Sequence, residues 1–218
     1  MFKHQIIKTM KKILSMAAIV AVSGIGLMAF KPAKIVSVSN TKSSFATKWT
    51  IDKAHTNILF SVSHLVVSDV EGKFKSFDGW MESDKADFSD AKIGFTVDIN
   101  SISTDNDMRD KHLKSDDFFN AEKFPQMKFE STSFIPTGGN KYKLTGNLTI
   151  RDITKPVTFD VTYGGTANAF GGIHAGFKAK ATVNRFDYNL KWSATTEAGG
   201  LVAGKDVDIT INIDLKRS

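Results

Sequence analysis

The segment from Ser103 to Pro125 carries the densest mix of ionisable and aromatic side chains in the chain. Arg109, Asp110 and His112 lie within four residues of one another, and such groups can hold a polar ligand or move a proton. Thr104 is a good helix N-cap, so we expect a helix of about three turns followed by a loop. Residues one or two apart do not share a helix face, so only one or two of these groups can point the same way.

Two further polar side chains interrupt apolar strand faces. Alternation places His64 at the end of one apolar row and Arg185 at the end of another. A buried charge needs a partner, so Arg185 either forms a salt bridge to Asp110 or Asp187, or contacts the polar group of a ligand. The polar residues expected around one end of the fold are His64, Arg109, Asp110, His112 and Arg185.

Catalysis and metal binding both have candidate residues. Asp110 with His112, or Asp52 with His55, could supply a general base and the group that orients it. The chain contains neither G-x-S-x-G nor H-E-x-x-H, which are spacings of a hydrolase nucleophile and of a zinc site. Four of the five histidines lie beyond residue 29, and none is at tight metal-ligand spacing. We therefore predict neither an enzyme nor a metal site.

Short runs of alternating apolar and polar residues lie on both sides of the Ser103–Pro125 segment, with the period of half-buried strands. The clearest run extends from Val207 to Leu215, and another is expected from Gly72 to Met81. About eight such runs at near-hairpin spacing favour a single antiparallel barrel over a sandwich. The predicted fold class is therefore all-β, an eight-stranded antiparallel barrel interrupted once by a short helix and loop near its end.

The same alternation predicts the inward face of the barrel. An eight-stranded barrel either fills its interior with side chains or leaves room for one small ligand. Small inward residues fit both cases, because they accommodate a bulky neighbour or a ligand. Phe118 and Phe119 are expected to cover the barrel end as an apolar lid, or to complete the core as a plug. The predicted cavity residues are Phe60, Val62, Phe95, Val97, Phe129, Gly146, Leu148, Phe159, Phe177, Ala179 and Ala181.

The N-terminal residues have the pattern of a secretory signal peptide. Four lysines precede an acid-free apolar run that ends near Ala29. We predict a signal peptide over residues 1–29, a Ser-, Thr- and Lys-rich linker over 30–48, and one folded domain over 49–218. The alternative is an uncleaved membrane anchor, and Met10 is an alternative start to Met1. After cleavage near Ala29 no membrane-spanning segment is expected.

Composition limits the partners. The formal net charge is +6, but removal of the four N-terminal lysines leaves 25 basic and 23 acidic residues, or +2. The exported part therefore has no basic block that would indicate a nucleic acid partner. The chain contains no cysteine, so disulfides and cysteine-bound metals are excluded.

Several motifs together resemble the YceI-like family of exported lipocalin-like proteins. They are W-x-I-D-x-x-H from Trp49 to His55, M-R-D-x-H-L from Met108 to Leu113, L-T-G-N-L-T-I-R-D-I-T-K-P-V from Leu144 to Val157, and N-R-F-D from Asn184 to Asp187. The resemblance covers Trp49 to about Lys216. It implies a periplasmic lipocalin-like barrel whose elongated apolar cavity binds a polyisoprenoid, with no other cofactor, and it implies that homodimers occur.

The predicted function is a non-enzymatic periplasmic carrier of a long-chain amphiphilic lipid. The resemblance implies a polyisoprenoid, of the isoprenoid quinone or polyprenyl phosphate type. One alternative is a non-catalytic structural or stress-related envelope protein with a filled barrel. Another is a hydrolase that uses Asp110 and His112. A continuous apolar cavity would distinguish the carrier from the filled barrel, and a polar pocket with several carboxylates and histidines would favour the hydrolase.

Overall fold

The computed structural model describes residues 46–218. The predicted signal peptide and residues 30–45 of the predicted linker lie outside the described residues, so these two predictions remain predictions. The first strand begins at Thr47, slightly before the predicted start of the domain at Trp49.

The described residues form strands for most of their length, with one α-helix and two short 3-10 helices. The helical elements are η1 (Ile99–Ser101), α1 (Asp107–Lys114) and η2 (Arg185–Tyr188). The strands are β1 (Thr47–Ile51), β2 (Asn57–His64), β3 (Ser68–Phe74), β4 (Phe77–Ser83), β5 (Lys92–Asp98), β6 (Ile102–Ser103), β7 (Gln126–Gly138), β8 (Lys141–Ile150), β9 (Ile153–Ala169), β10 (Gly172–Asn184) and β11 (Ala203–Arg217).

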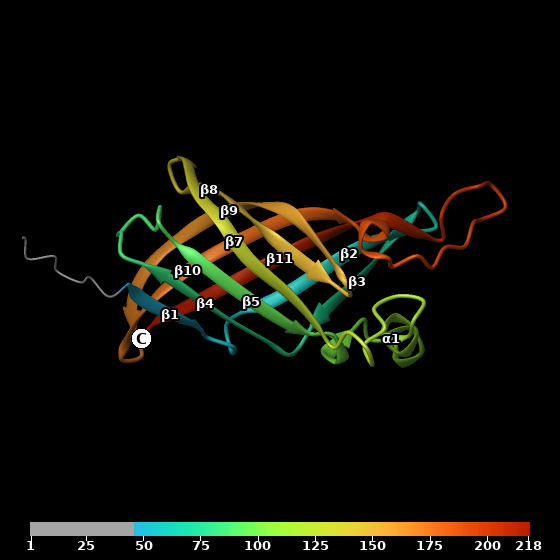
Figure 1. The fold of residues 1–218 in the computed structure, drawn as a ribbon, viewed down its shortest axis with the longest axis horizontal. Coiled ribbons are helices and arrows are strands. Elements are labelled where there is room, and N and C mark those ends of the chain that lie inside the picture. The colour runs from blue at the N-terminus through green and yellow to red at the C-terminus, as the bar shows by residue number, and fades with distance from the viewer. Residues whose placement is uncertain (1–45) are drawn as a thin grey trace, which may run out of the picture. The chain divides into compact units, whose positions relative to one another are not determined.

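Eight strands close into an antiparallel barrel, which confirms the predicted fold class. Neighbours follow the order β1-β4-β5-β7-β8-β9-β10-β11, and the ring closes because β1 also pairs with β11. The long strand β11 pairs with β1 near its C-terminal end and with β2 along its N-terminal half. Through β2 and then β3, the wall continues toward the end of the barrel that carries α1 (Figure 1).

The period of two in the sequence sets the inner wall. Residues directly opposite on paired strands point to the same face of a sheet. Ile213 lies opposite Phe177, and Ile209 lies opposite both Ala181 on β10 and Phe60 on β2. Apolar rows that are separate in the sequence therefore meet on the inside of the barrel.

The predicted strand from Gly72 to Met81 is wrong in one respect, because it is two strands. β3 ends at Phe74 and β4 begins at Phe77. The break is held by backbone hydrogen bonds from Lys75 N to Ser101 O and from Asp98 N to Ser76 O, at 3.2 and 3.0 Å. The chain changes direction there, which lets β3 pair with β2 and β4 pair with β1.

The predicted helix exists, but its start and length differ from the prediction. Asn106, and not Thr104, is the N-cap, because the Asn106 side chain accepts a hydrogen bond from the backbone N of Arg109 at 3.0 Å. The Thr104 hydroxyl instead donates to Asp110 Oδ1 at 2.6 Å. The helix therefore begins at Asp107, directly after its N-cap, and spans only eight residues.

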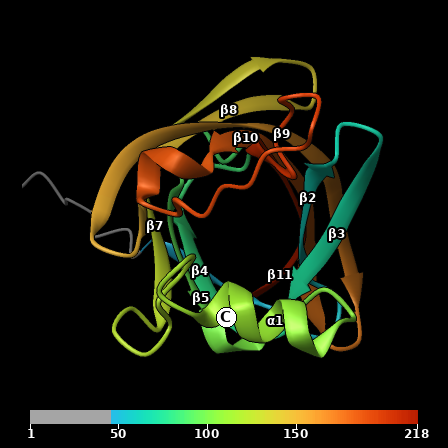
Figure 2. The ribbon, with the colours of Figure 1, turned by 90° about the vertical axis from the view of Figure 1, so that its right-hand side faces the viewer.

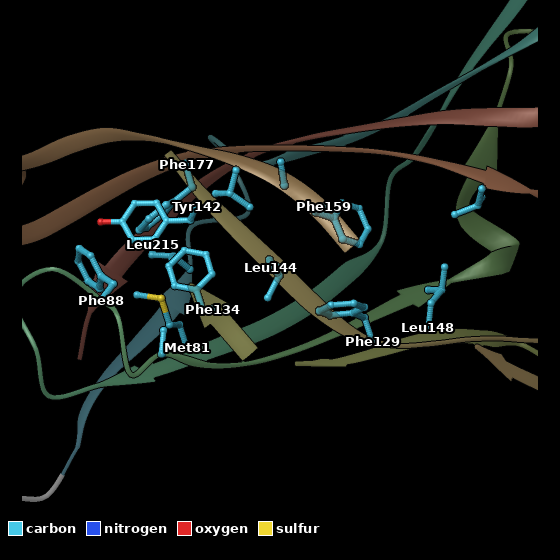
Figure 3. Close-up of a cluster of buried hydrophobic side chains, with 14 of the residues drawn as sticks. Met81, Phe88, Phe129, Phe134, Tyr142, Leu144, Leu148, Phe159, Phe177 and Leu215 are labelled. Atoms are coloured by element: carbon cyan, nitrogen blue, oxygen red, sulfur yellow. The ribbon is translucent and has the colours of Figure 1, made fainter. Parts of the chain in front are cut away.

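Aromatic side chains fill the end of the barrel away from α1. We call four of them the aromatic plug, namely Phe88, Phe134, Tyr142 and Phe177 (Figure 3). Phe134 and Tyr142 stack with ring centroids 4.6 Å apart, and Phe88 packs edge-on against Phe177 at 5.4 Å. Phe88 comes from the β4–β5 connection, which is held by the hydrogen bond from the Tyr142 hydroxyl to Asp87 O. Side chains therefore close this end, and any open space must lie nearer α1.

Gly146 provides a test of this packing. A Cβ at Gly146 would overlap the ring of Phe129 and come within 2.5 Å of the Glu130 carbonyl oxygen. We expect Gly146→Ala to destabilise the fold by ~1–3 kcal/mol, because overpacking forces a ring or a strand to move. Gly176→Ala is the matched control, since no atom lies within 4 Å of a Cβ there. Urea unfolding of both variants measures the difference, and equal midpoints would contradict the assigned packing.

Candidate ligand-binding cavity

The space inside the barrel is a row of three apolar chambers. The chamber nearest α1, called the mouth chamber here, has a volume of about 240 Å³. A middle chamber of about 110 Å³ and a far chamber of about 50 Å³ follow it toward the aromatic plug. Phe60 and Ile209 line both the mouth and middle chambers, while Phe95 and Ile213 line both the middle and far chambers. The three chambers therefore lie next to one another along the barrel interior, and we refer to them together as the apolar lumen.

The inward side chains of β11 also indicate a hollow interior. Val207, Ile209, Ile211 and Ile213 all face inward, yet each is only half-buried. In a barrel filled by its own side chains such residues would lose nearly all their accessible surface. The predicted alternative of a filled barrel therefore applies only to the end with the aromatic plug.

Nine of the eleven predicted cavity residues line the lumen. Gly146 faces inward, but the ring of Phe129 occupies the space in front of it. Ala181 also faces inward, opposite Ile209, and lines none of the three chambers. The residues that line the lumen are Phe60, Val62, Phe95, Val97, Phe129, Leu148, Phe159, Phe177 and Ala179.

Helix α1 and the segment that follows η2 border the mouth chamber (Figure 2). Arg109, His112 and Leu113 of α1 line it, as does His64 at the end of β2. Phe118 and Phe119 line it as well, so they lie where either a lid or a plug was predicted. Four of the five predicted polar residues thus surround one apolar space, and Asp110 is the exception.

Arg185 is buried beside the mouth chamber, with 5% of its surface exposed. Its Nε donates to Gly204 O, its Nη1 to Leu190 O and Trp192 O, and its Nη2 to Ala203 O, at 2.7 to 2.9 Å. The predicted salt bridge to Asp110 or Asp187 is wrong, because Asp187 pairs with Lys155 and Asp110 with Thr104. Burial lowers the pKa of the Arg185 guanidinium.

The second arginine of the mouth, Arg109, is exposed and held by one residue. Its Nε donates to Thr104 Oγ1 at 2.7 Å and its Nη2 to Thr104 O at 2.8 Å. Among residues 46–218, neither Arg109 nor Arg185 forms a salt bridge. Two cationic groups therefore border an apolar space without a carboxylate to balance them.

Asp110 and His112 do not form a catalytic pair. Asp110 Oδ1 accepts hydrogen bonds from the backbone N and the hydroxyl of Thr104, and Asp110 lies in a polar groove outside the mouth chamber. His112 faces the mouth chamber and hydrogen-bonds Asp117 through Nε2 at 2.8 Å. Positions i and i+2 of a helix point to different sides, which explains the separation.

Trp192 and Val202 also line the mouth chamber, although no sequence pattern predicted them there. The Trp192 ring lies 5.4 Å from that of His112 and 5.6 Å from that of Phe118. Both residues belong to the segment between η2 and β11, where no alternation or helical period is present. The only indication in the sequence that this segment belongs to the mouth was Arg185, whose hydrogen bonds hold the segment over the barrel end.

One group of described residues has the spacing to hold a metal ion, and it lies outside the lumen. Ligand atoms of Asp52, His174 and Asp214 lie within 4.8 Å of one another. Hydrogen bonds occupy part of this group, with His174 Nδ1 2.8 Å from Asp214 Oδ1 and His55 Nδ1 2.9 Å from Asp52 Oδ2, while His174 Nε2 is buried without a partner among the described residues. The bond to Asp52 raises the pKa of His55, and the same bond lowers the pKa of Asp52. The predicted absence of a metal site stays a prediction.

Comparison with known proteins decides the family. A family model described as the YceI-like domain matches residues 49–215. The chain belongs to the YceI-like family. Within residues 46–218, no helix combines the length and the apolarity that a bilayer crossing needs.

The similar proteins include curated relatives and solved structures. UPF0312 protein SAB2563 of Staphylococcus aureus is 40% identical over 163 residues, which cover 74% of this chain and 92% of the relative. A Burkholderia cenocepacia protein, BcnA, matches with a TM-score of 0.66 and 25% identity, over 75% of this chain and 98% of the other. The Campylobacter jejuni YCEI protein matches with a TM-score of 0.62 and 32% identity, over 78% and 97% of the two chains.

A fourth similar structure is a polyisoprenoid binding domain from Saccharophagus degradans. Its TM-score is 0.57 at 13% identity, over 80% of this chain and 99% of that one, so the likeness concerns the fold. The matched region makes up nearly the whole of each of these proteins. The YceI-like domain is therefore a folding unit by itself in these proteins, and here it lies within the described residues 46–218.

Proposed function

We propose that this YceI-like protein is a non-enzymatic carrier of a long-chain lipid, most specifically a polyisoprenoid, which it holds in the barrel lumen. The observation that carries the proposal is the row of adjacent apolar chambers from the mouth chamber to the aromatic plug. An elongated row of apolar chambers suits a chain of repeated apolar units better than a compact ligand. The fold shared with a polyisoprenoid binding domain supports the same ligand class.

Burial of a lipid chain in such a lumen is a large favourable contribution to binding. Burial of ~400 Å² of prenyl surface at ~25 cal/mol per Å² contributes about 10 kcal/mol before the entropic cost of binding. Micromolar affinity corresponds to about 8 kcal/mol. Apolar contact is therefore the main favourable contribution to noncovalent binding, and polar contacts at the mouth add to it.

The charge at the mouth favours an anionic head group. Arg109 and Arg185 both line the mouth chamber, and neither is paired with a carboxylate among the described residues. Four backbone carbonyls occupy most of the Arg185 donors, so Arg109 and His112 are the side chains with capacity to contact a ligand. A polyprenyl phosphate fits this arrangement better than a neutral isoprenoid quinone, because charge-assisted hydrogen bonds are the stronger ones.

The proposed place of action is the periplasm, after export and cleavage of the signal peptide near Ala29. One sequence feature supports it, the basic and then apolar N-terminus. We propose no catalytic step, since Asp110 and His112 bond to different partners. A homodimer stays a prediction.

Solvent extraction tests the proposal. Protein purified from its native envelope is expected to release a polyprenyl lipid that mass spectrometry identifies, and the delipidated protein is expected to take up solanesyl phosphate. Replacing the phosphate by the neutral solanesol should weaken binding about tenfold, the value of one charge-assisted hydrogen bond. An empty extract combined with no uptake of either probe would overturn the proposed function.

A further inference from the structure

The turn between β2 and β3 presents three consecutive apolar side chains to solvent. Leu65, Val66 and Val67 are 41%, 73% and 84% exposed. We call these three residues the apolar tip. Serines at positions 63 and 68 flank it on both strands. Exposed apolar residues are ordinary when they occur singly, whereas three in a row on a protruding turn indicate a contact surface.

The backbone of the apolar tip is strained in a way that its side chains do not favour. Leu65 and Val66 adopt the left-handed conformation, with φ of 54° and 66°. Tight hairpin turns with two positive φ values favour Asn-Gly, and a β-branched residue there is disfavoured by roughly 1–3 kcal/mol. Stability therefore does not explain why Leu and Val stand here. A role for the apolar side chains themselves explains it.

The apolar tip lies at the open end of the lumen. Leu65 N donates to Val202 O at 3.0 Å, and His64 Nδ1 donates to the same carbonyl at 2.9 Å. His64 and Val202 both line the mouth chamber. The turn thus projects beside the segment before β11, at the end of the barrel that carries α1 (Figures 1 and 2). Met108 on α1, 83% exposed, adds another apolar side chain at this end.

We propose that the apolar tip inserts into the surface of a lipid bilayer and so brings the mouth chamber to the membrane. The inference rests on the proposed function, because a polyisoprenoid resides in bilayers and its chain cannot cross water cheaply. Direct contact between the mouth and the bilayer lets the chain slide from one apolar environment into another. A protein partner is the competing occupant, and the experiment below distinguishes it.

The charges near the apolar tip indicate the mode of binding. Asp69 and Glu71 follow the tip on β3, whereas Lys111 and Lys114 lie on α1. Charges of both signs at this end give no preference for an anionic surface. The insertion is therefore hydrophobic, and it occurs with zwitterionic phosphatidylcholine vesicles and persists at high salt.

The decisive variant replaces the apolar tip by residues that suit the turn. Leu65→Asn, Val66→Gly and Val67→Ser together relieve the backbone strain and remove the apolar side chains. The matched control is Phe170→Ser, since Phe170 is 91% exposed in the β9–β10 turn. That turn lies beside the chain's C-terminus and away from α1 (Figure 1).

The experiment uses residues 43–218, flotation with phosphatidylcholine vesicles and thermal unfolding. The triple variant is expected to have an equal or higher Tm and a partition coefficient at least about tenfold lower, while Phe170→Ser partitions like the parent. Transfer of solanesyl phosphate from protein to vesicles slows in parallel, but binding of the same probe in detergent solution is unchanged. That solution measurement separates failure of docking from failure of the proposed carrier function.

Two results would overturn the inference. Equal flotation of the parent and the triple variant would show that the apolar tip does not contact lipid. A parent protein that binds the probe in solution but does not float with vesicles would exclude docking on a bare bilayer, and would assign the tip to a protein partner instead.

Discussion

Replacement of Arg185 by methionine is expected to lower the Tm by roughly 10 °C, the shift that ~4 kcal/mol produces in a domain of this size. The four carbonyl oxygens of Leu190, Trp192, Ala203 and Gly204 lose their donor together. Each unsatisfied buried polar group costs ~1–3 kcal/mol, and water reaches some of these oxygens in the variant. Differential scanning calorimetry measures the shift.

The other arginine of the mouth is the control for this prediction. Arg109 bonds only to Thr104 and is exposed, so Arg109→Met should cost no more than about 1 kcal/mol. Arg185→Lys should fall between the parent and Arg185→Met, because one ammonium group cannot reach four carbonyls. A Tm for Arg185→Met within about 2 °C of the parent would refute the assigned role of Arg185 as the tie that holds the mouth.

Val62→Trp is expected to abolish lipid uptake while it leaves the fold intact. Val62 lies opposite Val207 and Val70, and all three side chains line the mouth chamber. An indole ring at this position occupies space that a lipid chain must pass. We expect the affinity for solanesyl phosphate to fall by about 100-fold, or ~2.7 kcal/mol, with the Tm unchanged or raised because the ring fills apolar space.

Ser61→Trp on the same strand is the matched control. Ser61 pairs with Asp208 and Glu71 on the outer face, so its substitution does not narrow the lumen. Equilibrium binding of the fluorescent or radiolabelled probe compares the two variants. Uptake by Val62→Trp equal to that of Ser61→Trp would place the ligand outside the mouth chamber.

These two predictions assign different roles to residues of the mouth, because Arg185 holds the fold together and Val62 borders the space for the ligand. Arg185 was expected from the sequence to be either a salt-bridge residue or a head-group contact, and it uses its donors on backbone carbonyls instead. Its positive charge still borders the chamber. We therefore expect Arg185→Met to weaken binding of phosphorylated and neutral prenyl ligands alike, and Arg109→Met to weaken mainly the phosphorylated one.

The local sequence pattern was enough to predict the barrel and its inner wall. Alternation with period two is a local property, and it correctly placed Phe60, Phe95 and Ala179 on the lumen. The family motifs gave the same answer, and the family is confirmed over residues 49–215. Local pattern works here because each strand has only two faces, and one of them must be apolar to form the core.

How the mouth is built and how much of the interior is empty depend on tertiary contacts that the sequence pattern does not report. Phe129 fills the space at Gly146, whereas nothing comparable fills the space beside Val207 and Ile209. The odd or even position of a residue in a strand predicts which face of the sheet its side chain lies on. The volume left in front of that side chain depends on side chains from other strands. No periodic signal reports that volume.

The same limit applies to hydrogen-bond partners and strain. Thr104 was expected to cap the helix, yet it bonds Asp110, and the apolar tip adopts a conformation that its residues do not favour. The pairing of β2 with both β3 and β11 fixes where the tip projects, and Val202 holds it there. The position of the tip therefore arises from contacts between residues more than a hundred positions apart, which the closed barrel brings together and a local sequence pattern does not encode.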